Sequence, residues 1–202
     1  MYRSLCRWSG ATTILVVSKG RAMIGTPFPR SYWVYPGKFL AGCYPGDKDP
    51  SAAFQKLAGL LDHRIRHVIN LMEEDEVDHD GRPFMPYDTT LARLAAQRGV
   101  EVFCERFPIR DLGIPGREDM RLILDAVDRA IGRGMAVYVH CWGGKGRTGT
   151  VVGCWLARHG IARGPAVLEE IRRLRRRDPC AHEPSPETAA QRAMATSWGT
   201  GE

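Results

Sequence analysis

The sequence has no long hydrophobic run and no repeat of fixed period. A membrane-spanning helix needs about 20 mostly apolar residues in a row, and no segment of this chain approaches that length. Gly-Lys-Gly-Arg at 144–147 lacks the Ser or Thr that follows the lysine of a Walker A nucleotide loop. The arginines at 172–177 have no aromatic residues among them, which argues against a nucleic-acid surface. We therefore expect no stable membrane insertion, no repeat architecture and no nucleic-acid partner.

The composition fits one globular domain. Apolar residues make up 44% of the 202 residues, which is enough for a substantial core, and the formal net charge is +6. Six cysteines allow three disulfide bonds, but a chain of this size does not need them for stability. We expect free thiols and a reducing, cytoplasmic compartment.

The first thirty residues contain a short apolar segment, Ala11 to Val17, flanked by basic residues. This segment is at the short limit for a signal peptide, and no small-x-small cleavage site follows it. We therefore expect residues 1–30 to be an extension, either a disordered tail or an over-extended gene start. Residues 31–200 are expected to form a single domain.

The part of the chain that carries chemistry is a glycine-rich turn between an apolar strand and an apolar helix. The strand ends at His140, the turn runs from Cys141 to Gly146, and a run typical of a buried helix follows. Cys141 and Arg147 stand at the two ends of this turn, separated by five residues. The spacing lets one loop surround a tetrahedral anion, with a thiolate below it and a guanidinium beside it.

Such a loop suits phosphoryl transfer, which needs an in-line nucleophile and positive charge around the phosphate oxygens. A helix N-terminus offers unpaired N–H groups and favours the thiolate form of a cysteine placed before it. The planar fork of Arg147 matches two phosphate oxygens, and glycines permit the backbone angles that turn N–H groups inward. The predicted phosphate-binding residues are Trp142, Gly143, Gly144, Lys145, Gly146 and Arg147.

Two neighbours of the loop are also candidates for the chemistry. We expect His140 to orient the turn and favour the thiolate, and Thr148 to donate its hydroxyl to the sulfur when that sulfur leaves. The alternative for Cys141 is a small residue of the packed core, the commoner use of a cysteine in an apolar strand–helix unit. The combination of histidine, cysteine, glycines and arginine favours the catalytic interpretation.

The segment from His140 to Gly149, His-Cys-x5-Arg-Thr-Gly, resembles the signature of the cysteine-dependent protein tyrosine and dual-specificity phosphatase superfamily. It is most similar to compact dual-specificity members such as kinase-associated phosphatase, and the resemblance extends loosely over residues 32–198. It implies two-step hydrolysis of phosphomonoesters without metal or cofactor: Cys141 takes the phosphoryl group, and water then hydrolyses the phosphocysteine. It also implies a general acid, usually an Asp roughly thirty residues upstream.

Asp111 lies thirty residues before Cys141. Its surroundings contain a glycine and two prolines and follow a strand-like run at 100–107, a pattern typical of a loop at the end of a strand. We expect Asp111 to protonate the leaving oxygen, and the alternative is that it only caps a turn. Asp119 and Asp125 are weaker candidates, because their surroundings predict a helix.

Strand and helix patterns alternate along the chain. Strands are predicted near 38–45, 67–71, 100–107 and 135–140. Helices are predicted at 51–62, at 88–98, along 120–131, directly after the loop, along 167–174, and after 185–188. This alternation predicts an α/β fold with a central, mostly parallel twisted sheet flanked by helices on both faces, phosphatase-like and carrying the Cys-x5-Arg loop.

The loop side chains bear on the substrate. Lys145 occupies a position at which phosphoinositide phosphatases also carry a lysine, but Trp142 stands where they usually place a second one. The resemblance therefore favours a protein tyrosine or dual-specificity phosphatase. The alternatives are a phosphoinositide or inositol-phosphate phosphatase and a non-catalytic phosphoprotein-binding module, against which the set of Cys141, Arg147 and Asp111 argues. The partner is then a phosphorylated protein, small molecule or lipid head group.

Two features outside the loop are expected to lie on the protein surface. Gln191 is expected on the surface of the C-terminal helix, and positioning of the hydrolytic water is its alternative. The arginine run at 172–177 is expected to be a solvated helix face, with attraction of anionic substrates or lipids as the alternative.

Overall fold

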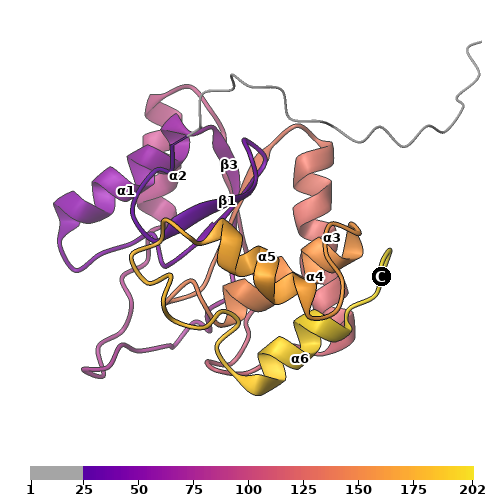
Figure 1. Cartoon of the computed structure of the whole chain (residues 1–202). Helices are drawn as coiled ribbons and strands as arrows, with labels where there is room; N and C mark the ends of the chain where they lie inside the picture. Colours follow the sequence, from indigo (N-terminus) through magenta and orange to yellow (C-terminus); the bar gives the residue numbers. More distant parts are fainter. Residues whose placement is uncertain (1–24) are drawn as a thin grey trace, which may run out of the picture.

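The computed structural model describes residues 25–202, and most of the predicted extension lies outside them (Figure 1). The strands are β1 (Ser31–Tyr35), β2 (Phe39–Gly42), β3 (Ile65–Asn70), β4 (Phe103–Arg106) and β5 (Ala136–His140). The helices are α1 (Pro50–Asp62), α2 (Asp88–Gln97), α3 (Arg117–Gly132), α4 (Arg147–Arg158), α5 (Ala166–Leu174) and α6 (Ala189–Ser197). No helix within 25–202 is both long enough and apolar enough to cross a membrane.

The strands form one sheet in the order β1-β2-β5-β3-β4. All neighbouring pairs are parallel except β1 and β2, which form an antiparallel hairpin. The predicted α/β fold with a mostly parallel sheet is therefore confirmed. The sequence prediction missed β1, although the turn after it has a recognisable signal. Pro36 is followed by Gly37 with φ of 73°, and the Lys38 N–H donates to the Tyr35 carbonyl at 3.0 Å.

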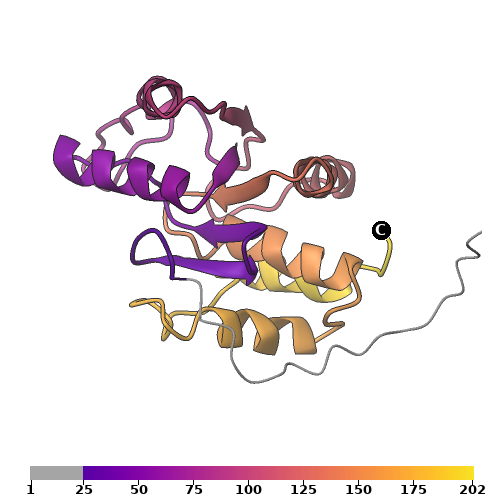
Figure 2. The ribbon, with the colours of Figure 1, turned by 90° about the horizontal axis from the view of Figure 1, so that it is seen from above.

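Helices cover both faces of the sheet, as the sequence predicts (Figure 2). Successive residues of a strand point to opposite faces, and β5 shows the consequence. Val137 and Val139 pack in the core formed with α3, α4, α5 and α6. Ala136 and Tyr138 pack in the core formed with α1 and α2. Because β5 is buried on both sides, the end of this strand is a fixed point for the loop that follows it.

Local capping explains where two of the helices begin. The Asp49 side chain accepts a hydrogen bond from the Ser51 N–H at 3.0 Å, and Pro50 occupies the first turn of α1. A capping box joins Thr188 and Gln191 at the start of α6, because each side chain bonds the other residue's backbone N–H. The predicted helix start near 185–188 is thereby confirmed to within one residue.

The carboxyl ends of the parallel strands meet at one edge of the sheet. Gly42 of β2 and Asn70 of β3 both lie opposite His140 of β5 in the strand register. The loops 43–49, 71–87, 107–116 and 141–146 therefore leave the sheet at this edge. Loops at this edge of an α/β sheet commonly carry binding sites.

The arginine run does not form a uniformly solvated face. Arg175 is 2% exposed, and its guanidinium contacts the Asp178 carboxylate at 3.1 Å. It also donates to the carbonyls of Cys180 at 3.0 Å and Glu183 at 3.1 Å. The surface prediction is wrong for Arg175, because α5 ends at Leu174 and the next side chain turns inward to hold the segment that follows.

Gly153 of α4 offers a test of helix packing. A Cβ at Gly153 would lie 2.6 Å from Ala195 Cβ and 3.1 Å from Val167 Cγ1. Alanine usually stabilises a helix by about 1 kcal/mol relative to glycine, but overpacking a core costs about 1–3 kcal/mol. Gly153→Ala should therefore lower the free energy of unfolding in urea by up to about 2 kcal/mol.

The matched control is Gly132→Ala at the end of α3, where an added Cβ meets no atom within 4 Å. This substitution should leave the free energy of unfolding unchanged or raise it. An equal gain for both substitutions would show that α4 and α6 can separate without cost.

Candidate active site

The loop between β5 and α4 is held from outside by its carbonyl groups. The Tyr44 N–H donates to the Trp142 carbonyl at 2.9 Å. Arg30, in a left-handed backbone conformation with φ of 63°, donates from Nη2 to the Gly143 carbonyl at 2.8 Å. Both donors come from segments next to β1 and β2, so the hairpin that the sequence prediction missed anchors the first half of the loop.

The second half of the loop is anchored by α4 and by the segment that precedes α6. The Ser185 hydroxyl donates to the Lys145 carbonyl at 2.7 Å, and Thr150 donates from its N–H and its hydroxyl to the Gly146 carbonyl, both at 2.9 Å. The C=O and N–H of a planar trans peptide point in opposite directions. Outward carbonyls therefore turn the intervening N–H groups toward the inside of the loop, an arrangement that suits an anion.

Gly144 is the glycine that the geometry of the loop requires. Its φ is +74°, and a Cβ would lie 2.5 Å from the Gly42 carbonyl carbon and 2.6 Å from the Cys43 nitrogen. A side chain at this position would clash with the backbone at the end of β2. The predicted need for glycine is thus supported at 144 by both conformation and space.

Cys141 lies directly after β5, and its side chain is 2% exposed at the base of the loop. His140 is fully buried beside it, and burial lowers the imidazole pKa to about 3. Its Nδ1 lies 3.3 Å from the Cys141 carbonyl and its Nε2 lies 2.6 Å from the Tyr87 hydroxyl. Because a carbonyl only accepts, Nδ1 carries the proton and Nε2 accepts from Tyr87.

The arrangement around His140 gives it an orienting role. A neutral imidazole adds no positive charge beside the sulfur, and the expectation that His140 favours the thiolate stays a prediction. Tyr87 keeps its proton because burial raises its pKa well above the ordinary value of 10. The ring is therefore fixed at the end of β5 by two hydrogen bonds, one with the Tyr87 hydroxyl and one with the Cys141 carbonyl.

Arg147 is the most strongly held side chain of the loop. Its fork contacts both oxygens of Glu76, at 2.6 and 2.7 Å, and donates to the Ile109 carbonyl at 3.0 Å. Burial alone would lower the arginine pKa, but the Glu76 carboxylate and the charges of Cys141 and Asp111 raise it. Glu76 belongs to the acidic run Glu73-Glu74-Asp75-Glu76 in the loop after β3, and none of these carboxylates is among the site residues predicted from the sequence. The sequence signal that could have identified Glu76 is that its loop follows β3, at the edge of the sheet that carries Cys141.

Asp111 lies beside the Arg147 guanidinium at the edge of the loop. Its Oδ1 is 2.9 Å from Arg147 Nη2, and its side chain is 49% exposed, so it borders both the loop and solvent. Asp119 and Asp125 lie within α3, as the sequence predicts, and Asp125 pairs with Arg158 at 2.6 Å. The structure brings only Asp111 of these three candidates to Arg147.

Thr148 is fully buried in the first turn of α4, directly after Arg147. Its hydroxyl donates to the Gly42 carbonyl at 3.4 Å. Donation to the departing sulfur requires the hydroxyl to turn away from this weak bond. The role predicted for Thr148 therefore stays a prediction.

The two large side chains of the loop contact side chains from other segments. The Trp142 ring packs against His79 at 4.3 Å and Phe84 at 5.3 Å between ring centroids. The Lys145 ammonium contacts the Glu183 carboxylate and lies 3.0 Å from Glu187 Oε1. Trp142 thus helps fix the loop from the side. Lys145 is an ion-paired residue, whereas the sequence alone is compatible with a solvated lysine or a phosphate-binding one.

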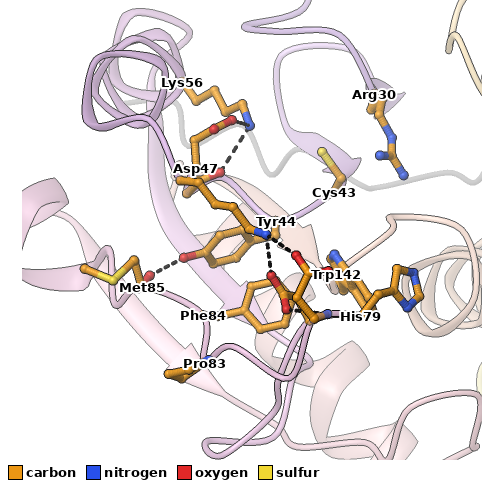
Figure 3. A pocket seen from close by; sticks show the side chains of 14 residues that line it. Arg30, Cys43, Tyr44, Asp47, Lys56, His79, Pro83, Phe84, Met85 and Trp142 are labelled. Atoms are coloured by element: carbon orange, nitrogen blue, oxygen red, sulfur yellow. Dashed lines mark hydrogen bonds and ion pairs between the residues drawn. The ribbon is translucent and has the colours of Figure 1, made fainter.

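A hollow of about 450 Å³ lies beside the loop (Figure 3). Aromatic rings of Tyr44, Phe84 and Trp142 form much of its wall, and Tyr44 packs edge-on against Phe84 with centroids 5.0 Å apart. Two lysines at the rim are neutralised locally: Lys56 pairs with Asp47 at 2.8 Å, and Lys48 pairs with Asp78 and Asp80. The hollow therefore combines an aromatic wall with a charge-balanced rim.

Gln191 is completely buried, so the predicted surface position is wrong. Its side-chain oxygen accepts from the N–H groups of Glu187 and Thr188 at 3.1 and 3.0 Å. Its side-chain nitrogen donates to the Gly113 carbonyl at 2.9 Å, two residues after Asp111. A Cβ on Gly146 would lie 3.2 Å from the same amide. Gln191 therefore lies between the acid-bearing loop and the cysteine loop.

A family model described as the Swiss Army Knife protein DSP-PTPase phosphatase domain matches residues 29–197. Among curated proteins, an uncharacterised Methanocaldococcus jannaschii protein, MJECL20, is 48% identical over 54 residues, which are 27% of this chain and 37% of that protein. Mouse dual specificity protein phosphatase CDC14B is 28% identical over 141 residues, or 63% of this chain and 24% of that protein. The phosphatidylglycerophosphate phosphatase PTPMT2 of Arabidopsis thaliana is 37% identical over 71 residues, or 35% and 31%. The chain thus spans between 24% and 37% of the length of these relatives.

Solved structures share the fold over most of their length. Tk-PTP in its active form is 25% identical, with a TM-score of 0.54 over 83% of this chain and 94% of that one. Kinase associated phosphatase with its catalytic cysteine replaced by serine is 16% identical, with a TM-score of 0.60 over 85% and 93%. The second likeness is one of fold alone.

The protonation state of His140 can be measured directly. Because its pKa in the folded chain is about 3, ring NMR shifts should remain those of the neutral form from about pH 8 to about pH 5. In urea the same ring should titrate near its ordinary pKa of about 6.5. A folded-state titration above about pH 5 would contradict the assignment.

The sign of the effect on stability follows from this difference. As pH falls below about 6.5, His140 binds a proton in the unfolded chain but stays neutral in the folded chain. The contribution of His140 to the free energy of unfolding is therefore complete above about pH 6.5 and declines toward pH 3.

Proposed function

The chain belongs to the family of Swiss Army Knife DSP-PTPase phosphatase domains, and we propose that it hydrolyses phosphomonoesters through a phosphocysteine on Cys141, with phosphorylated protein side chains as substrate. One observation carries the proposal. The Cys141 loop, the Arg147 fork and the Asp111 carboxylate meet at one place, with Asp111 Oδ1 2.9 Å from Arg147 Nη2. A module that only bound phosphoproteins would need neither a nucleophile at the base of the loop nor a carboxylate at its rim.

In the first step the Cys141 thiolate attacks phosphorus, an S–P bond forms, and the P–O bond to the leaving group breaks. Asp111 supplies the proton that the leaving oxygen takes up. The Arg147 fork and the N–H groups at the start of α4 stabilise the charge on the three equatorial oxygens. Both carboxylate oxygens of Glu76 accept from the Arg147 guanidinium and keep it in a fixed orientation.

In the second step a water molecule attacks phosphorus, and the Asp111 carboxylate accepts its proton. The S–P bond breaks, and the electron pair returns to sulfur, toward which the Thr148 hydroxyl turns. The products are inorganic phosphate and the free thiolate. His140 keeps the start of the loop in place throughout, because its ring is fixed by Tyr87.

The aromatic wall beside the loop supports a protein substrate. Tyr44, Phe84 and Trp142 offer apolar surface to a phosphorylated tyrosine or to the residues around a phosphorylated side chain. A phosphoinositide or inositol phosphate is the second candidate, favoured by the presence of a lysine within the loop. The five cysteines of the described chain are free thiols, which supports a reducing, cytoplasmic compartment.

The nucleophile is tested by replacing its sulfur. Cys141→Ser should abolish turnover of p-nitrophenyl phosphate and still bind a phosphotyrosine peptide in calorimetry, because the carbonyl anchors of the loop remain. Arg147→Lys should lose most activity, since an ammonium cannot replace the bidentate fork. The wild-type activity should persist in chelator and be blocked by vanadate. The control is Cys104→Ser, which changes an exposed thiol on β4; full activity of the Cys141→Ser protein would falsify the mechanism.

The acid is tested with two kinds of leaving group. Asp111→Asn should lower turnover of a phosphotyrosine peptide by about 10²–10⁴-fold, the range for a positioned general acid. An activated aryl phosphate should be affected less, because its leaving oxygen needs less protonation. Asp119→Asn, which changes a neighbouring carboxylate on α3, is the matched control. A large loss in the Asp119 variant, with the Asp111 variant unaffected, would reassign the acid.

A further inference from the structure

Lys145 lies inside the predicted phosphate-binding loop, yet its charge is already matched. The ammonium contacts the carboxylates of Glu183 and Glu187, and the three side chains are 24%, 33% and 31% exposed. Glu183 raises the pKa of Lys145, and Lys145 lowers the pKa of Glu183. Both partners therefore stay charged at neutral pH, and the two carboxylates around one ammonium leave this side of the loop net negative.

The position of Glu183 is fixed from within the fold. Buried Arg175 donates to the Glu183 carbonyl at 3.1 Å and to the Cys180 carbonyl at 3.0 Å. The same guanidinium pairs with Asp178, whose side chain is 5% exposed. The backbone that carries Glu183 is thus tied to the end of α5 by a buried cation, so the carboxylate is not a freely moving surface group.

The position of Glu187 is fixed by the start of α6. The Glu187 N–H donates to the buried Gln191 side chain at 3.1 Å, next to the capping box that begins the helix. Between the two glutamates, the Ser185 hydroxyl donates to the Lys145 carbonyl at 2.7 Å. One segment, residues 183–187, therefore holds both the backbone and the side chain of Lys145.

Arg147 is also paired with two carboxylates, those of Glu76 and Asp111. It differs from Lys145 because a guanidinium has five N–H donors, and because it stands at the start of α4, where helix N–H groups add to its charge. An ammonium has three donors, and two of those of Lys145 face Glu183 and Glu187. A second phosphate next to Lys145 would meet those two carboxylates as well as the cation.

We propose that Glu183 and Glu187 set the substrate class by keeping the Lys145 ammonium in ion pairs, where it does not bind phosphate. The loop then accepts a single phosphate group and disfavours substrates that carry several. The proposal rests on the phosphatase function proposed above. The charge-balanced lysines at the rim of the hollow agree with it, since Lys48 and Lys56 are also paired with carboxylates. A phosphorylated protein side chain fits this distribution of charge, and an inositol polyphosphate does not.

The experiment compares turnover of p-nitrophenyl phosphate, which has one phosphate, with that of myo-inositol hexakisphosphate. In Glu183→Gln/Glu187→Gln the amides keep their size and lose their charge. The ratio of kcat/KM for the polyphosphate to that for the monophosphate should rise at least about tenfold, mainly through KM, the effect of one hydrogen bond to a charged group. Adding Lys145→Ala to this variant should remove the gain.

The matched control is Glu169→Gln/Glu170→Gln on α5, which removes the same charge from glutamates paired with Arg172 and Arg173. A ratio that stays constant in the Glu183/Glu187 variant, or that rises equally in the control, would overturn the proposal. So would a gain that survives Lys145→Ala.

Failure of the phosphatase function itself is recognised separately, as no turnover of either probe by the wild-type chain. The same variants are therefore also made with Cys141→Ser, and their binding of hexakisphosphate and of a phosphotyrosine peptide is compared by calorimetry. The affinity ratio should shift by the same factor of about ten. An unchanged ratio would overturn the proposal without reference to catalysis.

Discussion

The site depends on one close approach between two backbones. The loop after β5 lies on the end of β2 because Gly144 has no side chain there. A Cβ on Gly144 would lie 2.5 Å from the Gly42 carbonyl carbon and 2.6 Å from the Cys43 nitrogen. This contact lets the Thr148 hydroxyl reach the Gly42 carbonyl. It also keeps the loop within reach of the N–H and O–H groups that donate to its carbonyls. The shape of the loop is therefore a property of the sheet edge as much as of the loop itself.

The second constraint is electrostatic. Arg147 is 1% exposed and Glu76 is 9% exposed, and their two contacts are charge-assisted and bidentate. Loss of one partner of such a buried pair costs about 3–5 kcal/mol, because the other charge remains without compensation. The loop after β3 and the loop after β5 are therefore stabilised together, and the guanidinium that would meet the substrate is oriented before any substrate arrives.

The sequence predicts the parts of this architecture that depend on local patterns. The α/β fold follows from alternating periodicities, and the Cys141 loop follows from a motif whose members lie within ten residues. The wrong assignments concern polar residues placed on the surface by residue type alone. Arg175 and Gln191 are buried because their side chains complete hydrogen bonding at helix ends. Glu76 and the partners of Lys145 lie far away in the chain, and no local pattern selects one carboxylate from an acidic run.

The amide of Gln191 serves two structures at once. Its oxygen completes the first turn of α6, and its nitrogen holds the carbonyl of Gly113 in the loop that carries Asp111. Order in that loop and order in the first turn of α6 are therefore thermodynamically linked, and each stabilises the other by the same free energy. A protein that bound and frayed the start of α6 would loosen the Asp111 loop without touching it. Binding at α6 would in this way change, from a distance, the order of the loop that carries Asp111.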